Sequence, residues 1–308
     1  MVKSNYGEKN QKIGVKLKNI SLKVKENDEL MKFLIENLPG KNRNNIKSLL
    51  KNGQILVNGV RTSQFNHKLV INDEVLVSAS RITEEHLQGI KIVYEDDDII
   101  AIEKPEGMLS IATDKEREKT AYNIVKEYIK AKNPNEKLFI VHRLDRGTSG
   151  VMIFAKTEGM QQVLQTNWQN FVKERKYVAV VEGRVEKDRD TLISYLKENS
   201  AMVTFSSPTE IEGSKKAITH YEVLKRSRGY SLVEADIETG RKNQIRVHMQ
   251  SIGHSIIGDK KYGAKTNPLR RLGLHARTIV FKHPRTNKIL SFETKIPTRF
   301  SAMFKIAR

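Results

Sequence analysis

The chain of 308 residues contains no cysteine. It can form neither a disulfide nor a thiolate metal site, which fits an intracellular protein. No apolar run approaches the roughly 18 residues that a membrane-spanning helix needs. The segment from Met1 to Val15 is basic but lacks the apolar core of a secretory signal. The sequence therefore predicts a cytoplasmic protein with no membrane association.

Acidic residues are also scarce. Lys and Arg number 55 against 36 Asp and Glu, which gives a formal net charge of +19. An excess of this size favours a polyanionic partner, either nucleic acid or an anionic membrane surface. Because nothing in the chain would enter a bilayer, we expect nucleic acid. The glycine-rich strings that bind nucleotide phosphates do not occur, so we expect no nucleotide cofactor.

One dense polar turn lies between two apolar segments, Phe139–Val141 and Val151–Ala155, which are typical of buried strands. Asp145 is the single carboxylate of this turn, and Arg143 and Arg146 flank it. An isolated Arg-Leu-Asp-Arg string is more often a structural ion pair. The alternative is that Asp145 is a nucleophile on a loop held between two buried elements. The wider sequence decides between these two readings.

The segment from His142 to Lys156 reads His-Arg-Leu-Asp-x-x-Thr-Ser-Gly, then an apolar strand and Ala-Lys. It resembles the signature of the RluA family, RNA pseudouridine synthases of the large-ribosomal-subunit type. Tyr177 lies in a segment similar to the family's Lys-x-Tyr-x-Ala-x-Val-x-Gly, with Arg175 in place of the Lys. Arg246 lies in a segment similar to Thr-Gly-Arg-x-His-Gln-Ile-Arg-x-His, with Asn243 in place of the first His.

The resemblance implies roles for these residues. Asp145 matches the family's catalytic Asp, which forms a covalent bond to C1′ of the ribose or to C6 of the uracil. Arg246 matches the Arg that pairs with it. Tyr177 is expected to pack on the flipped uracil and could help remove the C5 proton. Arg143, Arg241 and Gln244 are expected to contact the RNA.

Two groupings raise the question of a metal site. Asp96, Asp97 and Asp98 are consecutive, and side chains that alternate along an extended strand cannot converge on one ion, so we interpret them as a solvated turn. The spacings of the histidines match no known zinc pattern. These are His248, His254, His275 and His283. We therefore expect no metal.

The first 80 residues have a different pattern. Apolar spacing predicts a helix over Leu30–Leu38, capped by Asp28, and a second over Ile46–Leu50. A hairpin at Asn58-Gly59 and a strand over Glu74–Val77 follow. No acid occurs between residues 41 and 61, which favours phosphate contact by the basic residues there. The arrangement is similar to an S4 RNA-binding domain, and its basic residues are Lys41, Arg43, Lys47, Lys51 and Arg61.

We therefore expect a basic tail over residues 1–16, an S4 domain over 17–80, a linker over 81–91 and a pseudouridine synthase domain over 92–308. The catalytic domain should be α+β, with a large mixed, mainly antiparallel sheet, beside the small α/β S4 domain. Strands are expected at 92–94, 99–102, 173–183, 217–222, 230–236 and 244–248, and helices at 120–132 and 160–171.

The expected partner is RNA, and the expected form is a monomer that uses no cofactor. Large-subunit ribosomal RNA is the commonest substrate of the family, and transfer RNA is also used. A non-catalytic, ribosome-associated RNA-binding protein would show the same charge and the same S4 domain. The matching set of Asp145, Tyr177 and Arg246 favours the enzyme.

Overall fold

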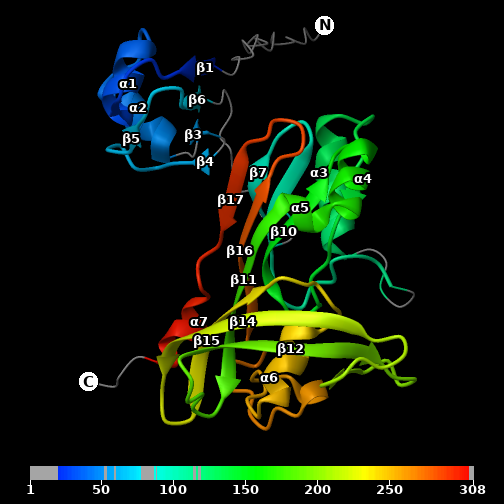
Figure 1. Ribbon diagram of the computed structural model, residues 1–308. Coiled ribbons are helices and arrows are strands. Elements are labelled where there is room, and N and C mark those ends of the chain that lie inside the picture. Colours follow the sequence, from blue (N-terminus) through cyan, green and yellow to red (C-terminus); the bar gives the residue numbers. More distant parts are fainter. Residues whose placement is uncertain are drawn as a thin grey trace, which may run out of the picture. The chain divides into compact units, whose positions relative to one another are not determined.

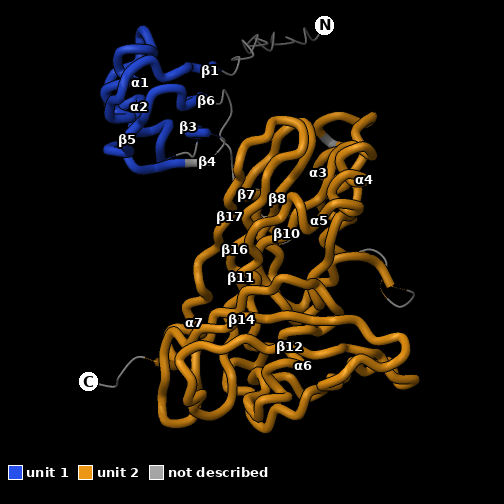
Figure 2. The backbone as a smooth tube through the Cα atoms, viewed as in Figure 1, with its two compact units in different colours: residues 1–85 blue, residues 86–308 orange. Residues whose placement is uncertain are grey.

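The computed structural model describes residues 20–51, 54–58, 60–77, 87, 89–113, 116 and 119–304. The chain forms two compact units, residues 1–85 and 86–308 (Figure 2). The predicted basic tail and most of the predicted linker lie outside the described residues. The side chain of Arg61 lies outside them as well.

The smaller unit combines two helices with a small antiparallel sheet (Figure 1). The helices are α1 (Leu30–Asn37) and α2 (Arg43–Lys51). The sheet has the order β1-β6-β3-β4, and the short strands β2 and β5 pair separately. The strands are β1 (Ile20–Lys23), β2 (Asp28–Glu29), β3 (Ile55–Val57), β4 (Val60–Arg61), β5 (Lys68–Leu69) and β6 (Glu74–Val77). The predicted helices, hairpin and last strand are confirmed.

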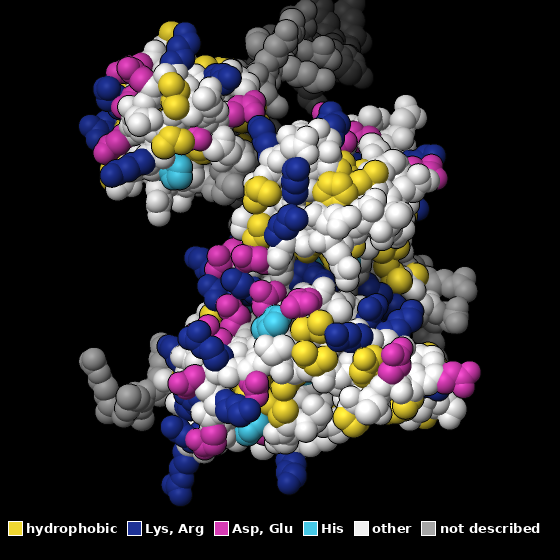
Figure 3. All heavy atoms as spheres, viewed as in Figure 1, with side chains coloured by type: hydrophobic (Ala, Val, Ile, Leu, Met, Phe, Trp, Pro, Cys, Tyr) yellow, Lys and Arg dark blue, Asp and Glu magenta, His cyan; other side chains and the backbone are white. Residues whose placement is uncertain are grey.

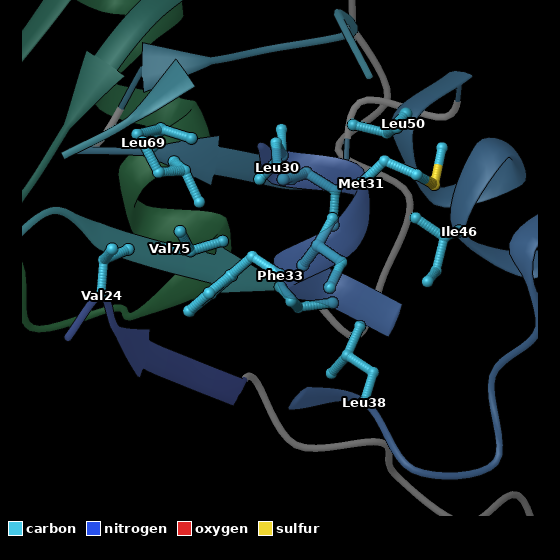
Figure 4. Close-up of a cluster of buried hydrophobic side chains, with 13 residues drawn as sticks. Val24, Leu30, Met31, Phe33, Leu38, Ile46, Leu50, Leu69 and Val75 are labelled. Carbon is cyan, nitrogen blue, oxygen red and sulfur yellow. The ribbon is translucent and has the colours of Figure 1, made fainter. Parts of the chain in front are cut away.

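The apolar sides of both helices meet in the core of this unit. Leu30 and Phe33 from α1 lie in one cluster with Ile46 and Leu50 from α2 and with the strand residue Val75 (Figure 4). The prediction that Asp28 caps α1 is wrong. The residue that precedes α1 is Glu29, whose side chain makes no capping hydrogen bond, and Asp28 lies in β2.

The larger unit is built on a mixed sheet of eleven strands. Its main path runs β13-β12-β14-β15-β11-β16-β10-β8-β7, with β17 beside β16 and β9 beside β10. Neighbours are antiparallel except β10 and β16, which run parallel. The predicted mixed, mainly antiparallel sheet is confirmed. Its strands are β7 (Lys91–Glu95), β8 (Ile99–Lys104), β9 (Phe139–Ile140), β10 (Ser149–Ala155), β11 (Val172–Glu182), β12 (Arg189–Glu198), β13 (Thr204–Ser207), β14 (Lys215–Arg226), β15 (Tyr230–Ile237), β16 (Leu274–Lys282) and β17 (Ile289–Glu293).

Strand β10 is buried on both faces, because helices cover the sheet from two sides. Met152 and Phe154 point into a cluster with α3 (Ala121–Lys132). The alternate residues Val151 and Ile153 point into a cluster with α4 (Glu158–Thr166). Figure 1 shows both helices and the short α5 (Trp168–Phe171) beside this part of the sheet. The loop that precedes β10 is therefore anchored to a strand that is buried along its whole length.

One predicted strand is a helix. Residues 244–248 belong to α6 (Gln244–Ser251), which packs on the sheet through Ile245 and Met249. The string Gln-Ile-Arg-Val-His alternates in polarity and imitates a strand. Gln244, Ile245 and His248 are all buried. His248 follows the other two by four and three residues, and these spacings place side chains on one face of a helix. The last helix of the described residues is α7 (Thr298–Ala302), and a short 3-10 helix spans Lys260–Tyr262.

At Gly150, β10 approaches β16 very closely. Gly150 has φ of +115°, and a Cβ atom there would lie 2.0 Å from the backbone oxygen of Ala276 on β16. We expect Gly150→Ala to lower the free energy of unfolding by about 4 kcal/mol or more, because neither the backbone angle nor the space suits a side chain. Denaturant unfolding measures this change.

Gly159 supplies the matched control. It lies in α4, and a Cβ atom there would meet nothing within 4 Å. Gly159→Ala should leave the free energy of unfolding unchanged or raise it by up to about 1 kcal/mol. Equal stability of the two variants would contradict the packing described for Gly150.

Candidate active site

Asp145 lies on the loop between β9 and β10, and its side chain is 30% exposed. The backbone N–H of Thr148 donates to the carbonyl of Asp145, which closes a tight turn. Ser110 also holds the loop, since its hydroxyl donates to the Leu144 carbonyl and accepts from the Leu144 N–H. The carboxylate is therefore presented by a backbone that is hydrogen-bonded on both sides.

Lys104 supports the same loop from inside the protein. Its side chain is fully buried, and Nζ donates to the carbonyls of Pro105 (3.0 Å), Met108 (2.8 Å) and Arg146 (3.5 Å). Burial and the nearby Arg271 charge lower the pKa of Lys104 to about 8, although the charge of Asp145 raises it. Lys104 thus links the end of β8 to the loop that carries Asp145.

Arg246 on α6 is the direct partner of Asp145. Its Nη1 donates to Oδ2 of Asp145 at 2.9 Å. The flanking arginine Arg146 points elsewhere, toward Glu116 and the Gly107 carbonyl. Burial lowers the pKa of Arg246, but the hydrogen bonds and charges of Asp259 and Asp145 outweigh this effect and raise it. Arg246 therefore stays charged beside Asp145.

Two residues to which the sequence assigned no contact hold Arg246 in place. Asp259, with its side chain 1% exposed, accepts from Nε at 2.6 Å and from Nη2 at 2.8 Å. Asn243 accepts from Nη1 at 2.8 Å and donates to the hydroxyl of Tyr262 at 2.9 Å. Asn243 adopts a left-handed backbone angle, φ of +56°, which Asn tolerates better than most residues. In the sequence, only the block Gly258-Asp259-x-x-Tyr262-Gly263 could have pointed to Asp259 and Tyr262 as residues of the site.

Tyr177 stands on β11 between Ala235 of β15 and Ala276 of β16. It lines a small cavity of about 80 Å³ together with Asp145 and Arg246. Burial raises the pKa of the Tyr177 phenol, Arg175 lowers it and the Asp145 charge raises it again, with a net rise. The structure thus brings together the three residues that the sequence proposed as catalytic.

The predicted RNA contacts near the site differ in accessibility. Arg143 is exposed and Arg241 is half-buried, and both line the Asp145 cavity. Gln244 is buried, and its amide is used inside the protein: Nε2 donates to the Ile218 carbonyl and the Thr219 hydroxyl, and Oε1 accepts from Thr239 and Arg241. We therefore reassign Gln244 from RNA contact to support of the loop before α6.

In the smaller unit, the predicted RNA contacts lie on or near α2. Lys41, Arg43, Lys47 and Lys51 are all exposed. The last three recur every four residues, so they share one side of the helix, next to the buried Ile46 and Leu50. This side of α2 offers three positive charges to solvent.

The sequence predicted that the acidic turn at residues 96–98 is solvated. This prediction is wrong for Asp98. Asp98 is buried, and His283 Nε2 lies 3.4 Å from one oxygen of Asp96 and one of Asp98. The two carboxylates converge because the chain turns there between β7 and β8. However, Nδ1 of His283 accepts from the N–H groups of Arg285 and Thr286. Since Nδ1 accepts these hydrogen bonds, a ring proton lies on Nε2, and that nitrogen has no lone pair for a metal.

Two solved structures share the fold of the larger unit. Human RNA Pseudouridylate Synthase Domain Containing 4 aligns with a TM-score of 0.57 and 23% identity, over 68% of this chain and 90% of that chain. Human RNA Pseudouridylate Synthase Domain Containing 1 aligns with a TM-score of 0.55 and 21% identity, over 70% and 88%. The architecture that carries the Asp145 cavity is thus the pseudouridine synthase fold.

Sequence comparisons identify the family. The family described as RNA pseudouridylate synthase matches residues 98–251. YlyB of Bacillus subtilis, described as an uncharacterized RNA pseudouridine synthase, is 32% identical over 292 residues, which cover 92% of this chain and 95% of YlyB. Ribosomal large subunit pseudouridine synthase D of Neisseria meningitidis serogroup B is 33% identical over 294 residues, which cover 88% and 76%. The chain belongs to the RNA pseudouridine synthase family and is an isomerase. In the described residues, no helix is long and apolar enough to cross a membrane.

Proposed function

We propose that the enzyme converts uridine in large-subunit ribosomal RNA to pseudouridine, with Asp145 as the covalent nucleophile. The contact of Arg246 with Asp145 inside a cavity that Tyr177 also lines carries the assignment of the nucleophile. The substrate follows from the relative in Neisseria meningitidis, whose name specifies the large ribosomal subunit. The net charge of +19 suits a polyanionic substrate of this kind.

The proposed reaction consumes no redox equivalent and no group donor. The target base leaves the helical stack and enters the cavity. The Asp145 carboxylate then bonds to C1′ of the ribose or to C6 of the uracil, the N1 glycosidic bond breaks, and the base turns. C5 bonds to C1′, the C5 proton leaves, and the Asp145 carboxylate is released. Arg246 keeps the carboxylate oriented toward the cavity through these steps.

The surroundings of Tyr177 favour one of its two predicted roles. Removal of the C5 proton by Tyr177 would need a phenolate, and its raised pKa disfavours that form at neutral pH. Packing of the ring on the uracil needs no ionisation. We therefore assign Tyr177 the packing role.

The smaller unit is proposed to be an S4 RNA-binding domain. Its two short helices, hairpin and closing strand support this, as does the basic side of α2. Phosphate contacts of this kind position the RNA without specifying its sequence. A non-catalytic RNA-binding protein would use this unit equally well. The organised Asp145–Arg246–Asp259 contacts support catalysis instead.

Replacing Arg43, Lys47 and Lys51 together with Gln should flatten the salt dependence of RNA binding. Each lost phosphate contact lowers the slope of log K against log salt by about 0.7–0.9, so the slope should fall by about 2–3. Binding titrations between 50 and 200 mM salt would measure this slope, a range within which such contacts change affinity by orders of magnitude.

A matched triple variant gives the control. Arg184, Lys187 and Arg189 are exposed cations of the larger unit, and each already lies within 4 Å of an acid, Glu186, Asp190 and Glu222 respectively. Their replacement with Gln should change the slope little. An unchanged slope in the α2 variant would remove α2 from the RNA-binding surface.

The substrate class is tested with separate transcripts of large-subunit ribosomal, small-subunit ribosomal and transfer RNA. Each is incubated with the enzyme, and pseudouridines are then mapped by chemical modification and primer extension. Pseudouridine at a defined position of the large-subunit RNA alone is the expected result. Pseudouridine in transfer RNA alone would reject the proposed substrate and leave the activity in place.

A further inference from the structure

We propose that a second cavity, beside the Asp145 cavity, binds an unpaired nucleotide that neighbours the target uridine in the RNA. This inference rests on the proposed function, because it concerns the same RNA strand. The cavity measures about 590 Å³ and lies between the catalytic loop, α5 and the segment that leads into α6. Its volume lies within the range of roughly 300–1,000 Å³ that is common for ligand pockets.

The two cavities are neighbours. Arg143, Tyr177, Ile237 and Arg241 line both of them. An RNA strand that places one base against Asp145 therefore passes over Arg143 and Arg241 into the larger cavity. The wall between the cavities is made of side chains that suit a phosphate and a ribose, since two of the four are arginines.

The lining of the larger cavity fits a nucleotide in charge. Arg143, Arg175 and Arg241 contribute three cations, and none of the described residues that line it is acidic. Such a lining is notable in a chain with 36 acidic residues, many of them paired with cations elsewhere. On the face drawn in Figure 3, Lys and Arg side chains lie across the middle of the larger unit, with Asp and Glu side chains among them, so the absence of acids is a property of the cavity lining itself. The positive charge of the cavity lining favours an anionic ligand.

Trp168 supplies a platform for a base. It is the only tryptophan of the chain, and its side chain is half-buried on α5. The His142 ring lies against it, with centroids 5.0 Å apart, and the Arg175 guanidinium carbon lies 6.0 Å from its centroid. Aromatic rings and arginine planes are the surfaces on which unpaired bases stack.

The platform is connected to the catalytic loop. His142 precedes Asp145 by three residues, and its Nε2 accepts from the N–H of Ile153 on β10 at 2.9 Å. Burial and the Arg175 charge lower the pKa of His142 to about 3, so the ring remains a neutral acceptor. The platform at Trp168 and the loop that carries Asp145 are therefore both connected to β10.

Arg175 is also held in a fixed position. Its Nη2 donates to the Glu238 carbonyl at 2.7 Å. A Cβ atom on Gly240 would lie 2.7 Å from Nη1, so the bare backbone of Gly240 makes room for the guanidinium. The remaining lining near α5 is rich in amides, which can donate to and accept from base edges. These are Gln165, Asn167, Gln169 and Asn170.

Tryptophan fluorescence of the full chain tests this site, because Trp168 is the sole tryptophan. The probe is penta-adenylate, which supplies bases but no uridine to isomerise. The comparison probe is a five-residue abasic ribose-phosphate strand of equal backbone charge. Penta-adenylate should quench Trp168 and the abasic strand should not. Equal quenching by both strands, or quenching by neither, would overturn the proposal.

Substitution of Trp168 tests the platform by affinity. Trp168→Ala should weaken penta-adenylate binding by about 5- to 150-fold, the range for loss of one base–aromatic stack, and Trp168→Phe should retain most of the affinity. Phe205→Ala is the control, because Phe205 is an exposed aromatic on β13 outside the cavity lining. Affinity of Trp168→Ala within about threefold of wild type would overturn the proposal.

A second pair of variants covers the case in which Trp168→Ala fails to fold. Gln169→Glu adds a negative charge to the exposed edge of the cavity, and Gln162→Glu adds the same charge to an exposed position on α4 outside the lining. Gln169→Glu should weaken penta-adenylate binding several-fold more than Gln162→Glu. Equal effects of the two variants would overturn the proposal.

Failure of this site and failure of the proposed function give different results. If the second cavity is not a nucleotide site, pseudouridine still forms but Trp168 does not respond to penta-adenylate. If the proposed function fails, no pseudouridine forms in large-subunit ribosomal RNA, and the response of Trp168 is measured independently of turnover.

Discussion

Replacing Asp145 with Asn should reduce pseudouridine formation by at least about 10⁴-fold, because an amide cannot serve as the nucleophile. Losses of this size are typical when the residue that forms the covalent intermediate is removed. Single-turnover reactions, followed by digestion of the RNA and separation of its nucleosides, would measure the rate.

The same substitution should leave the fold intact. Asn can still accept from Nη1 of Arg246, and Arg246 keeps its two hydrogen bonds to Asp259. No buried charge therefore loses its partner, and we expect the free energy of unfolding to change by less than about 1 kcal/mol. RNA affinity, measured by gel shift, should be unchanged or slightly higher. Turnover within tenfold of wild type would remove Asp145 from the role of nucleophile.

Replacing Arg246 with Lys should lower kcat by about 10²–10³-fold, with a much smaller change in RNA affinity. Lys retains the charge but has no planar fork, so it cannot donate to both oxygens of Asp259 and to Asp145 at once. Loss of a preorganised electrostatic contact in an active site has an effect of this size. Steady-state kinetics together with equilibrium binding would separate the two quantities.

Arg184→Lys is the matched control, because Arg184 is exposed and lies 3.8 Å from Glu186, away from the site. It should alter neither kcat nor affinity. Arg246→Ala is a poorer test, because it leaves the carboxylate of Asp259 buried without its cation, at a cost of about 3–5 kcal/mol. A loss of RNA affinity without a loss of kcat in Arg246→Lys would make Arg246 a phosphate contact.

Local features of the fold could be predicted from the sequence. The apolar segments on both sides of Asp145 are β9 and β10, and β3 and β4 pair antiparallel as the predicted hairpin requires. Thr120 lies at the expected start of α3 and caps it, since its hydroxyl accepts from the N–H of Asn123. These features depend on neighbours in the chain, where residue spacing and turn chemistry decide the outcome.

Features that depend on distant segments could not be predicted. The alternation in Gln-Ile-Arg-Val-His fits a strand equally well, and only packing against the sheet makes it α6. Asp96, Asp98 and His283 converge because β16 and β8 belong to one sheet. The hydrogen bonds of the buried Gln244 likewise depend on β14, where the Thr219 hydroxyl and the Ile218 carbonyl lie 25 and 26 residues earlier in the chain.

The catalytic residues of the site were predicted from the sequence, but the contacts that hold them in place were not. Matching motifs proposed Asp145, Tyr177 and Arg246, and the structure places them around one cavity. The replacement of the family's His by Asn243 left open how that position acts. In the structure, Asn243 links Arg246 to Tyr262, so the amide holds the arginine that holds Asp145. The role of Asp259 could not be assigned from the sequence, because its contact with Arg246 depends on where α6 lies.

Release of tritium from RNA labelled at C5 of uridine tests the central claim most directly, because formation of pseudouridine must expel that hydrogen. The wild-type enzyme and Asp145→Asn would be compared on the same large-subunit ribosomal RNA. Release by the wild type, one tritium for each pseudouridine formed, and loss of release in the variant is the predicted result. Equal release by both proteins would contradict the claim that the Asp145 cavity is the active site.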